Sequence, residues 1–128
     1  INQDSSAADV LSPLTLTGYT GSPLAVAASS ISASNHQHYL LTTTNLYGWG
    51  HSARTINTAV ITDVALTTIA LPAGVLIGDI NFIRASNGGV ALVTNSGHVW
   101  IKAGNNSICT LKSVMQGIVN FKINVYVI

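Results

Sequence analysis

The sequence contains two similar stretches whose matching positions lie 52 residues apart. Ile31-Ser-Ala-Ser-Asn35 returns as Ile83-Arg-Ala-Ser-Asn87, and Leu40-Leu41-Thr42 returns as Leu92-Val93-Thr94. Self-similarity at a period of about 20–50 residues is the signature of a repeat architecture, in which neighbouring copies share a core. This repeat constrains the fold more than any other feature of the chain.

Each copy has the residue pattern of a β-hairpin. Apolar residues alternate along Val90–Thr94, Asn95-Ser96-Gly97 has turn chemistry, and His98–Lys102 forms a second extended run. Other segments are rich in Val, Ile and Thr, which favour strands, whereas no amphipathic helix with caps is found and the nearest candidate is Cys109–Gln116. We expect strands at Leu24–Ala33, His38–Thr43, Leu46–Gly50, Val75–Ala85, Val90–Thr94 and His98–Lys102, with further β-rich segments at Val60–Thr62, Thr68–Leu71 and Ile118–Ile128.

The first hairpin carries a recognisable motif. Leu40-Leu-Thr-Thr-Thr-Asn-Leu-Tyr-Gly-Trp-Gly50 resembles the repeat of the regulator of chromosome condensation family, in which an apolar strand, a Thr and a turn precede an apolar-Tyr-small-Trp-Gly strand. The second copy is similar, with one residue inserted, Trp100 at the Tyr position and Lys102 at the Trp position. The resemblance implies an all-β fold of antiparallel β-propeller-type blades, about two repeats in an incomplete ring. The structural alternative is a β-sandwich or a pilin-like subunit with two similar hairpins.

The family's best-known activity is nucleotide exchange on a small GTPase. Where the family usually has Gly residues and a His before the first strand, this chain has Ser34, Asn35 and Gln37, and in the second copy Ser86, Asn87 and Gly89. The Gly-Gln-Leu-Gly segment that usually follows the Trp-Gly is absent after Gly50. That activity is therefore not transferred to any residue of this chain.

The organisation along the chain follows from the repeat. We expect one propeller segment over 1–128, with repeat units at approximately 15–66 and 67–117 and the start of a further unit at 117–128. Propeller rings close with about 4–8 blades, so we expect the chain to be part of a larger polypeptide or a permanent assembly. A final half-unit that completes the first unit is the alternative. The tail residues expected to be buried against the remainder are Ile118, Phe121, Ile123 and Val125.

Charge is scarce. Charged residues make up 7% of the chain, there is no glutamate, and the formal net charge is +1, against about 25% charged residues in ordinary domains. Without a basic surface, binding to nucleic acid or to anionic lipid loses its main driving force. No run of about 20 apolar residues predicts membrane insertion, and a surface rich in Ser, Thr and Asn with few charges is typical of extracellular or cell-surface β proteins.

No pattern of catalytic residues is found. The four aspartates do not form a paired-carboxylate site, and Ser96 is interpreted as a turn residue. His36 and His38 project to one face of a strand, and His51 could join them as a third nitrogen ligand, but without a neighbouring acid in the sequence we interpret them as loop residues. We predict no enzyme activity, no cofactor and no metal site, and we expect the single cysteine, Cys109, to be buried.

The predicted function is a non-enzymatic binding or adhesion module of a secreted or cell-surface protein, with a protein or glycan partner. Two alternatives stay open: an intracellular scaffold or GTPase-regulator-like propeller, and a structural subunit or repeat of a surface filament. Aromatic residues at equivalent repeat positions are expected to fill the space between blades rather than to form a stacking platform: Tyr39, Tyr47, Trp49 and Trp100. Loops carry recognition, and the predicted binding residues are His51, Arg54, Asn105 and Asn106.

Overall fold

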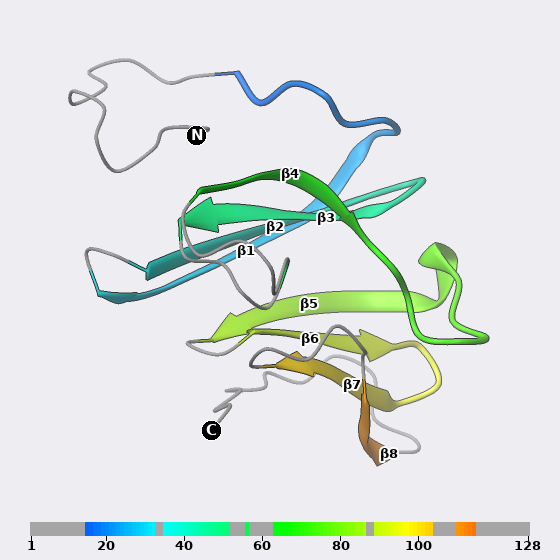
Figure 1. Cartoon of the computed structure of the whole chain (residues 1–128). Coiled ribbons are helices and arrows are strands. Elements are labelled where there is room, and N and C mark those ends of the chain that lie inside the picture. Colours follow the sequence, from blue (N-terminus) through cyan, green and yellow to red (C-terminus); the bar gives the residue numbers. More distant parts are fainter. Residues whose placement is uncertain are drawn as a thin grey trace.

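The described part of the chain folds into two four-stranded antiparallel sheets (Figure 1). The computed structural model describes residues 15–32, 35–51, 56, 63–86, 89–103 and 110–114. The first sheet contains β1 (Pro23–Ser32), β2 (Asn35–Thr42), β3 (Leu46–His51) and β4 (Asp63–Ile69). The second contains β5 (Ile80–Ser86), β6 (Gly89–Thr94), β7 (His98–Ala103) and β8 (Thr110–Val114).

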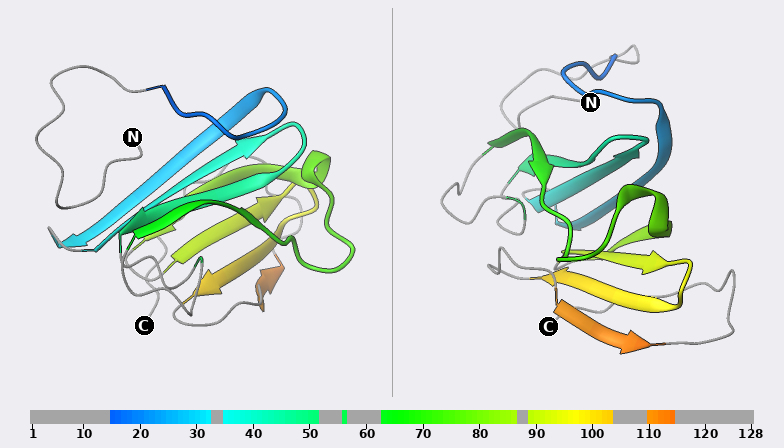
Figure 2. Two further views of the ribbon diagram at one scale, coloured as in Figure 1. Left: turned by 45° about the horizontal axis from the view of Figure 1, so that its top comes forward. Right: turned by 90° about the vertical axis from the view of Figure 1, so that its right-hand side faces the viewer.

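In both sheets the strand order follows the chain, so each strand pairs with the next. The two sheets stack on each other, and their first strands, β1 and β5, are in contact (Figure 2). The only helix in the described part of the chain is one 3-10 turn, Ile77–Asp79. The fold is therefore all-β, with two propeller-type antiparallel blades that form an incomplete ring, as the sequence predicts.

The main core lies between the two sheets. It joins side chains of the first sheet to side chains of the second, and its members are almost completely removed from solvent. Alternate residues of β2 and of β6 supply half of this core, because side chains on a strand point to opposite faces in turn. The buried residues are Tyr39, Leu41, Leu46 and Ile69 from the first sheet and Ile80, Ile83, Val90 and Leu92 from the second.

Strand register shows how the repeat is built. Leu40 pairs with Tyr47, and Leu92 pairs with Trp100. The leucines are 52 positions apart and the aromatic residues 53, so the second hairpin holds one more residue in its turn. The predicted insertion and the placement of Trp100 at the Tyr47 position are confirmed.

A buried threonine closes each hairpin. The hydroxyl of Thr42 accepts hydrogen bonds from the backbone N–H groups of Thr44 and Asn45, at 3.2 and 3.0 Å. The hydroxyl of Thr94 accepts one from the N–H of His98 at 3.1 Å. Local side-chain hydrogen bonds of this kind satisfy backbone groups that the strand ladder leaves unpaired.

The four aromatic residues divide between two faces. Tyr39 is buried between the sheets, and Trp100 packs against the same cluster. Tyr47 and Trp49 instead lie on the other face of the first sheet, with Leu40, where Leu16, Tyr19 and Leu66 pack against them. Tyr39 and Trp100 lie between the two sheets as expected. For Tyr47 and Trp49 the expectation stays a prediction, because alternation along β3 points them away from the second sheet, towards the face where a further blade would lie.

Several predicted boundaries shift. The strand expected at Val75–Ala85 begins at Ile80, because the chain first turns at Ala73-Gly74 and then forms the 3-10 turn. The expected boundary between units at 66/67 falls inside β4. Cys109–Gln116, the nearest helix candidate, overlaps strand β8. Cys109, Val60–Thr62 and the tail 117–128 lie outside the described residues.

Candidate functional site: a polar pocket beside Trp100

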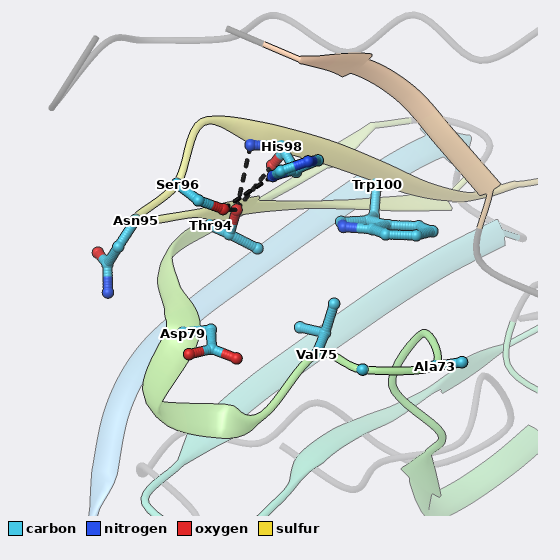
Figure 3. Close-up of a pocket in the computed structure, with 9 residues that line it drawn as sticks. Ala73, Val75, Asp79, Thr94, Asn95, Ser96, His98 and Trp100 are labelled. Carbon is cyan, nitrogen blue, oxygen red and sulfur yellow. Dashed lines mark hydrogen bonds between the residues drawn. The ribbon is translucent and has the colours of Figure 1, made fainter. Parts of the chain in front are cut away.

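A pocket of about 360 Å³ lies at the turn end of the second sheet. It opens between the β6–β7 hairpin turn on one side and the segment that leads into β5 on the other (Figure 3). One aromatic ring, one carboxyl group and several hydrogen-bonding side chains line it. The lining residues are Ala73, Gly74, Val75, Asp79, Thr94, Asn95, Ser96, His98 and Trp100.

Two turns meet at this pocket and hold each other in place. The carboxylate of Asp79 accepts the backbone N–H of Leu76 at 2.8 Å, which closes the 3-10 turn. The backbone N–H of Asn95 donates to the carbonyl of Asp79 at 2.8 Å, and the amide of Asn95 donates to the carbonyl of Gly78 at 3.3 Å. Asp79 and Asn95, which are exposed, therefore sit side by side although they belong to different turns.

A chain of three polar side chains runs along the hairpin turn. The hydroxyls of Thr94 and Ser96 are 2.9 Å apart, and the hydroxyl of Ser96 is 2.8 Å from Nδ1 of His98. Figure 3 shows these groups on one side of the pocket and Asp79 on the other. The two hydrogen bonds hold residues 94, 96 and 98 together at the turn.

Trp100 supplies the apolar wall. Its Nε1 is covered and has no hydrogen-bond partner among the described residues. The equivalent residue of the first sheet, Tyr47, is hydrogen-bonded instead. Its hydroxyl accepts hydrogen bonds from the backbone N–H of Thr20 at 3.1 Å and from the side-chain amide of Asn45 at 3.2 Å. The pocket exists because the segment 71–76, unlike the segment 15–20, makes no such bond to its aromatic residue.

The pocket offers mixed but weakly charged chemistry. Asp79 and Asn95 supply acceptor oxygens and Ser96 supplies a hydroxyl, and among the described residues no Lys or Arg lines the pocket. A site of this kind suits a ligand that donates hydrogen bonds and presents an apolar face to the indole ring.

Of the predicted binding residues, only His51 lies in the described part of the chain; Arg54, Asn105 and Asn106 lie outside it. His51 ends β3, at the opposite end of the strands from the hairpin turns, and does not line the pocket. Its Nδ1 is 2.6 Å from the carboxylate of Asp63. The structure thus does not bring His51 into the pocket.

His36 and His38 lie on strand β2. The interpretation of these two histidines as loop residues is therefore wrong. The ring of His38 stacks on Trp49, with centroids 5.4 Å apart and planes tilted by 23°. Burial, together with the nearby His36, lowers the pKa of His38 below its usual 6.5. Within the described ranges, no three His, Cys, Asp or Glu side chains are grouped so that they could hold a metal ion.

An apolar groove of about 480 Å³ lies on the face of the first sheet that carries Leu40 and Trp49. Its floor is formed by Leu40, His38 and Trp49, and its rim includes Val26, which is 74% exposed. The face that carries the groove points away from the second sheet, and Leu16, Tyr19 and Leu66 pack on it.

Sequence reasoning missed Asp79, Asn95 and His98 as site residues. Asn95 and Ser96 were identified only as a turn, and nothing in the spacing connects Asp79 to them, because their contact depends on the 3-10 turn that replaces the expected strand. The usable signal was the change from Tyr47 to Trp100 at equivalent repeat positions.

No family model matches the chain, and no curated protein matches it. Among solved structures the chain is similar to the crystal structure of human WBSCR16, with 15% identity, a TM-score of 0.48 and coverage of 70% of this chain and 24% of that chain. The chain thus spans less than a third of that protein, and the family named from the sequence stays a prediction. In the described part of the chain, no helix is long and apolar enough to cross a membrane.

Proposed function

We propose that this chain is a non-enzymatic binding module of a secreted or cell-surface protein, and that the pocket beside Trp100 holds a neutral, hydroxyl-rich ligand of the glycan class. The observation that carries the proposal is the combination of an indole ring with Asp79 and Asn95 in one pocket of about 360 Å³.

The chemistry of a sugar matches these groups. Sugar hydroxyls donate hydrogen bonds to carboxylate and amide oxygens, and the C–H face of a sugar ring packs on an aromatic side chain. A few placed polar groups in an otherwise apolar pocket are what gives a small-molecule site its specificity. The turns that carry Asp79 and Asn95 are bonded to each other, so the two groups are held in place before a ligand arrives.

Binding without catalysis is favoured by the surroundings of Ser96 and His98. In hydrolases with this pair, the histidine takes the serine proton while a carboxylate holds its other nitrogen. In the described part of the chain no carboxylate bonds to His98, and the Ser96 hydroxyl is shared with Thr94. The pair therefore serves as a turn bond and as part of the pocket wall.

An extracellular location is supported by composition. Charged residues make up only 7% of the chain, and the pocket itself is lined by neutral side chains with one exception. Recognition through hydrogen bonds and an aromatic ring needs no charged surface.

A glycan array tests the proposal. Labelled wild-type protein should bind a defined subset of neutral glycans, and Asn95→Ala and Ser96→Ala should each reduce that signal by about ten-fold, since one lost hydrogen bond in a site amounts to about 0.5–1.5 kcal/mol and more when a partner group is left unpaired. Asn45→Ala, in the turn of the first hairpin, is the matched control and should keep the wild-type pattern. Absence of any glycan signal, or equal loss in all three variants, would refute the proposal.

A further inference from the structure

Three residues of the first sheet, His36, His51 and Asp63, form a row across neighbouring strands that we call the histidine row. His51 pairs with Asp63 between β3 and β4. His36 lies on β2 two positions before His38, which pairs with Trp49, so the antiparallel register carries His36 towards His51. The rings of His36 and His51 have their centroids 6.1 Å apart.

Gly50 makes this approach possible. Its φ is 147°, in a region that favours glycine, and a side chain there would collide with the backbone carbonyl of His36. Without a Cβ at this position, β3 comes close to β2 just before His51. The close approach brings the two imidazoles together from strands that are adjacent in the sheet.

Asp63 fixes the orientation of His51. A carboxylate only accepts hydrogen bonds, so at 2.6 Å the Nδ1 of neutral His51 is the donor. Its Nε2 then carries the lone pair. A carboxylate that holds the second nitrogen of a histidine is the usual support of a metal-ligating imidazole, because it sets the tautomer and the ring orientation.

We infer that the histidine row binds a divalent transition-metal ion, with His36 and His51 as the two protein ligands, Asp63 as the group that orients His51, and water in the remaining positions. A metal–nitrogen bond of about 2.0–2.1 Å places a ring centroid roughly 3 Å from the metal. Two imidazoles on one ion therefore have centroids about 4–6 Å apart, and the observed centroids are 6.1 Å apart with the planes tilted by 47°, so ligation requires the two rings to rotate towards each other.

The coordination chemistry selects the metal. Imidazole ligands suit Cu²⁺, Ni²⁺ and Zn²⁺, and affinity for a given nitrogen site is highest for Cu²⁺, which accepts square-planar or tetragonal sets of nitrogen and oxygen ligands. The row is accessible to solvent: the side chains of His51 and Asp63 are 19% and 46% exposed. His36 lines a surface hollow with Ala28, Ser29 and His38.

His38 is excluded from the ligand set by its contact. Its ring is stacked on Trp49, a buried residue, and leaving that position would break the stack. His98 belongs to the other sheet, where it bonds to Ser96. These two histidines supply matched controls for the same substitution.

Titration calorimetry with Cu²⁺ on the full chain tests the inference. One equivalent should bind; His36→Ala and His51→Ala should each weaken binding by more than ten-fold, and Asp63→Asn by about ten-fold. His38→Ala and His98→Ala should stay within two-fold of wild type. Electron paramagnetic resonance of the wild-type Cu²⁺ complex, which needs no variant to fold, should show two coordinating nitrogens.

Three results would overturn the assignment: no stoichiometric binding of Cu²⁺, an affinity unchanged in the His36→Ala, His51→Ala double variant, or a loss in His98→Ala as large as in His36→Ala. Circular dichroism of each variant separates loss of the ligand from loss of the fold.

Discussion

The hydroxyl of Tyr47 lies 3.1 Å from both the backbone nitrogen and the hydroxyl of Thr20. This contact joins the segment 15–20 to the hairpin of the first sheet across 27 positions of sequence. The hydrogen bonds from Thr20 also lower the pKa of Tyr47 below 10.0. Trp100, at the same repeat position, makes no such bond to the segment that precedes β5, and a pocket opens there instead.

Removing the Tyr47 hydroxyl should therefore loosen the segment 15–20. We expect Tyr47→Phe to lower the melting temperature, and Tyr47→Phe combined with Thr20→Val to lower it by less than the sum of the two single changes, because both remove the same contact. Differential scanning calorimetry of the four proteins measures this coupling. Additive effects would show that the contact does not hold the segment.

Gly50 should not tolerate a side chain. Gly50→Ala places a Cβ against the carbonyl of His36 and forces a strained φ, and strain of this kind amounts to about 1–3 kcal/mol before the collision is added. Gly78→Ala is the matched control, since a Cβ there meets nothing within 4 Å. Urea unfolding of both variants checks the prediction, and equal midpoints would contradict it.

The core between the sheets should be sensitive to loss of volume. Leu92 is 0% exposed, whereas Leu76 is 70% exposed. Leu92→Ala should lower the free energy of unfolding by about 2–5 kcal/mol, because the cavity is only partly refilled. Leu76→Ala, the same chemical change on the surface, should have little effect. Similar losses for both would mean that the two sheets do not share this core.

Acid should destabilise the protein through His38. Its pKa is lowered in the folded chain by burial and by His36, so below the unfolded pKa of about 6.5 the unfolded chain binds more protons than the folded one. Stability should then fall as the pH drops from 8 to 5. In His38→Gln the urea midpoint should depend less on pH than in wild type; equal slopes for wild type and His38→Gln would refute this.

The repeat made the fold predictable because its signals are local. The alternation along Val90–Thr94 and the turn at Asn95–Gly97 each predict a hairpin without reference to the rest of the chain, and the register confirms the shift of one residue between Tyr47 and Trp100. The predicted start of the strand at Val75 was wrong. Hydrogen bonds of Asp79 with Leu76 and Asn95 hold the segment before Ile80 in a turn, although its residues favour strands.

The sites were less predictable because their contacts join residues that are far apart in the sequence. Asp79 meets Asn95 through backbone bonds between two separate turns. Asp63 meets His51 across a strand pair whose connection, 52–62, shows no sequence signal for that register. Contacts of this kind form only when the separate segments pack together, so no regular spacing in the sequence predicts them.

The central claim, that the pocket beside Trp100 holds a neutral glycan, is tested most directly by tryptophan fluorescence, because the chain has two tryptophans. In Trp49→Phe the emission comes from Trp100 alone, and in Trp100→Phe from Trp49 alone. Titration with the glycans selected on the array should give a saturable change of emission in Trp49→Phe and none in Trp100→Phe. No saturable change in Trp49→Phe, or an equal change in both proteins, would contradict the claim.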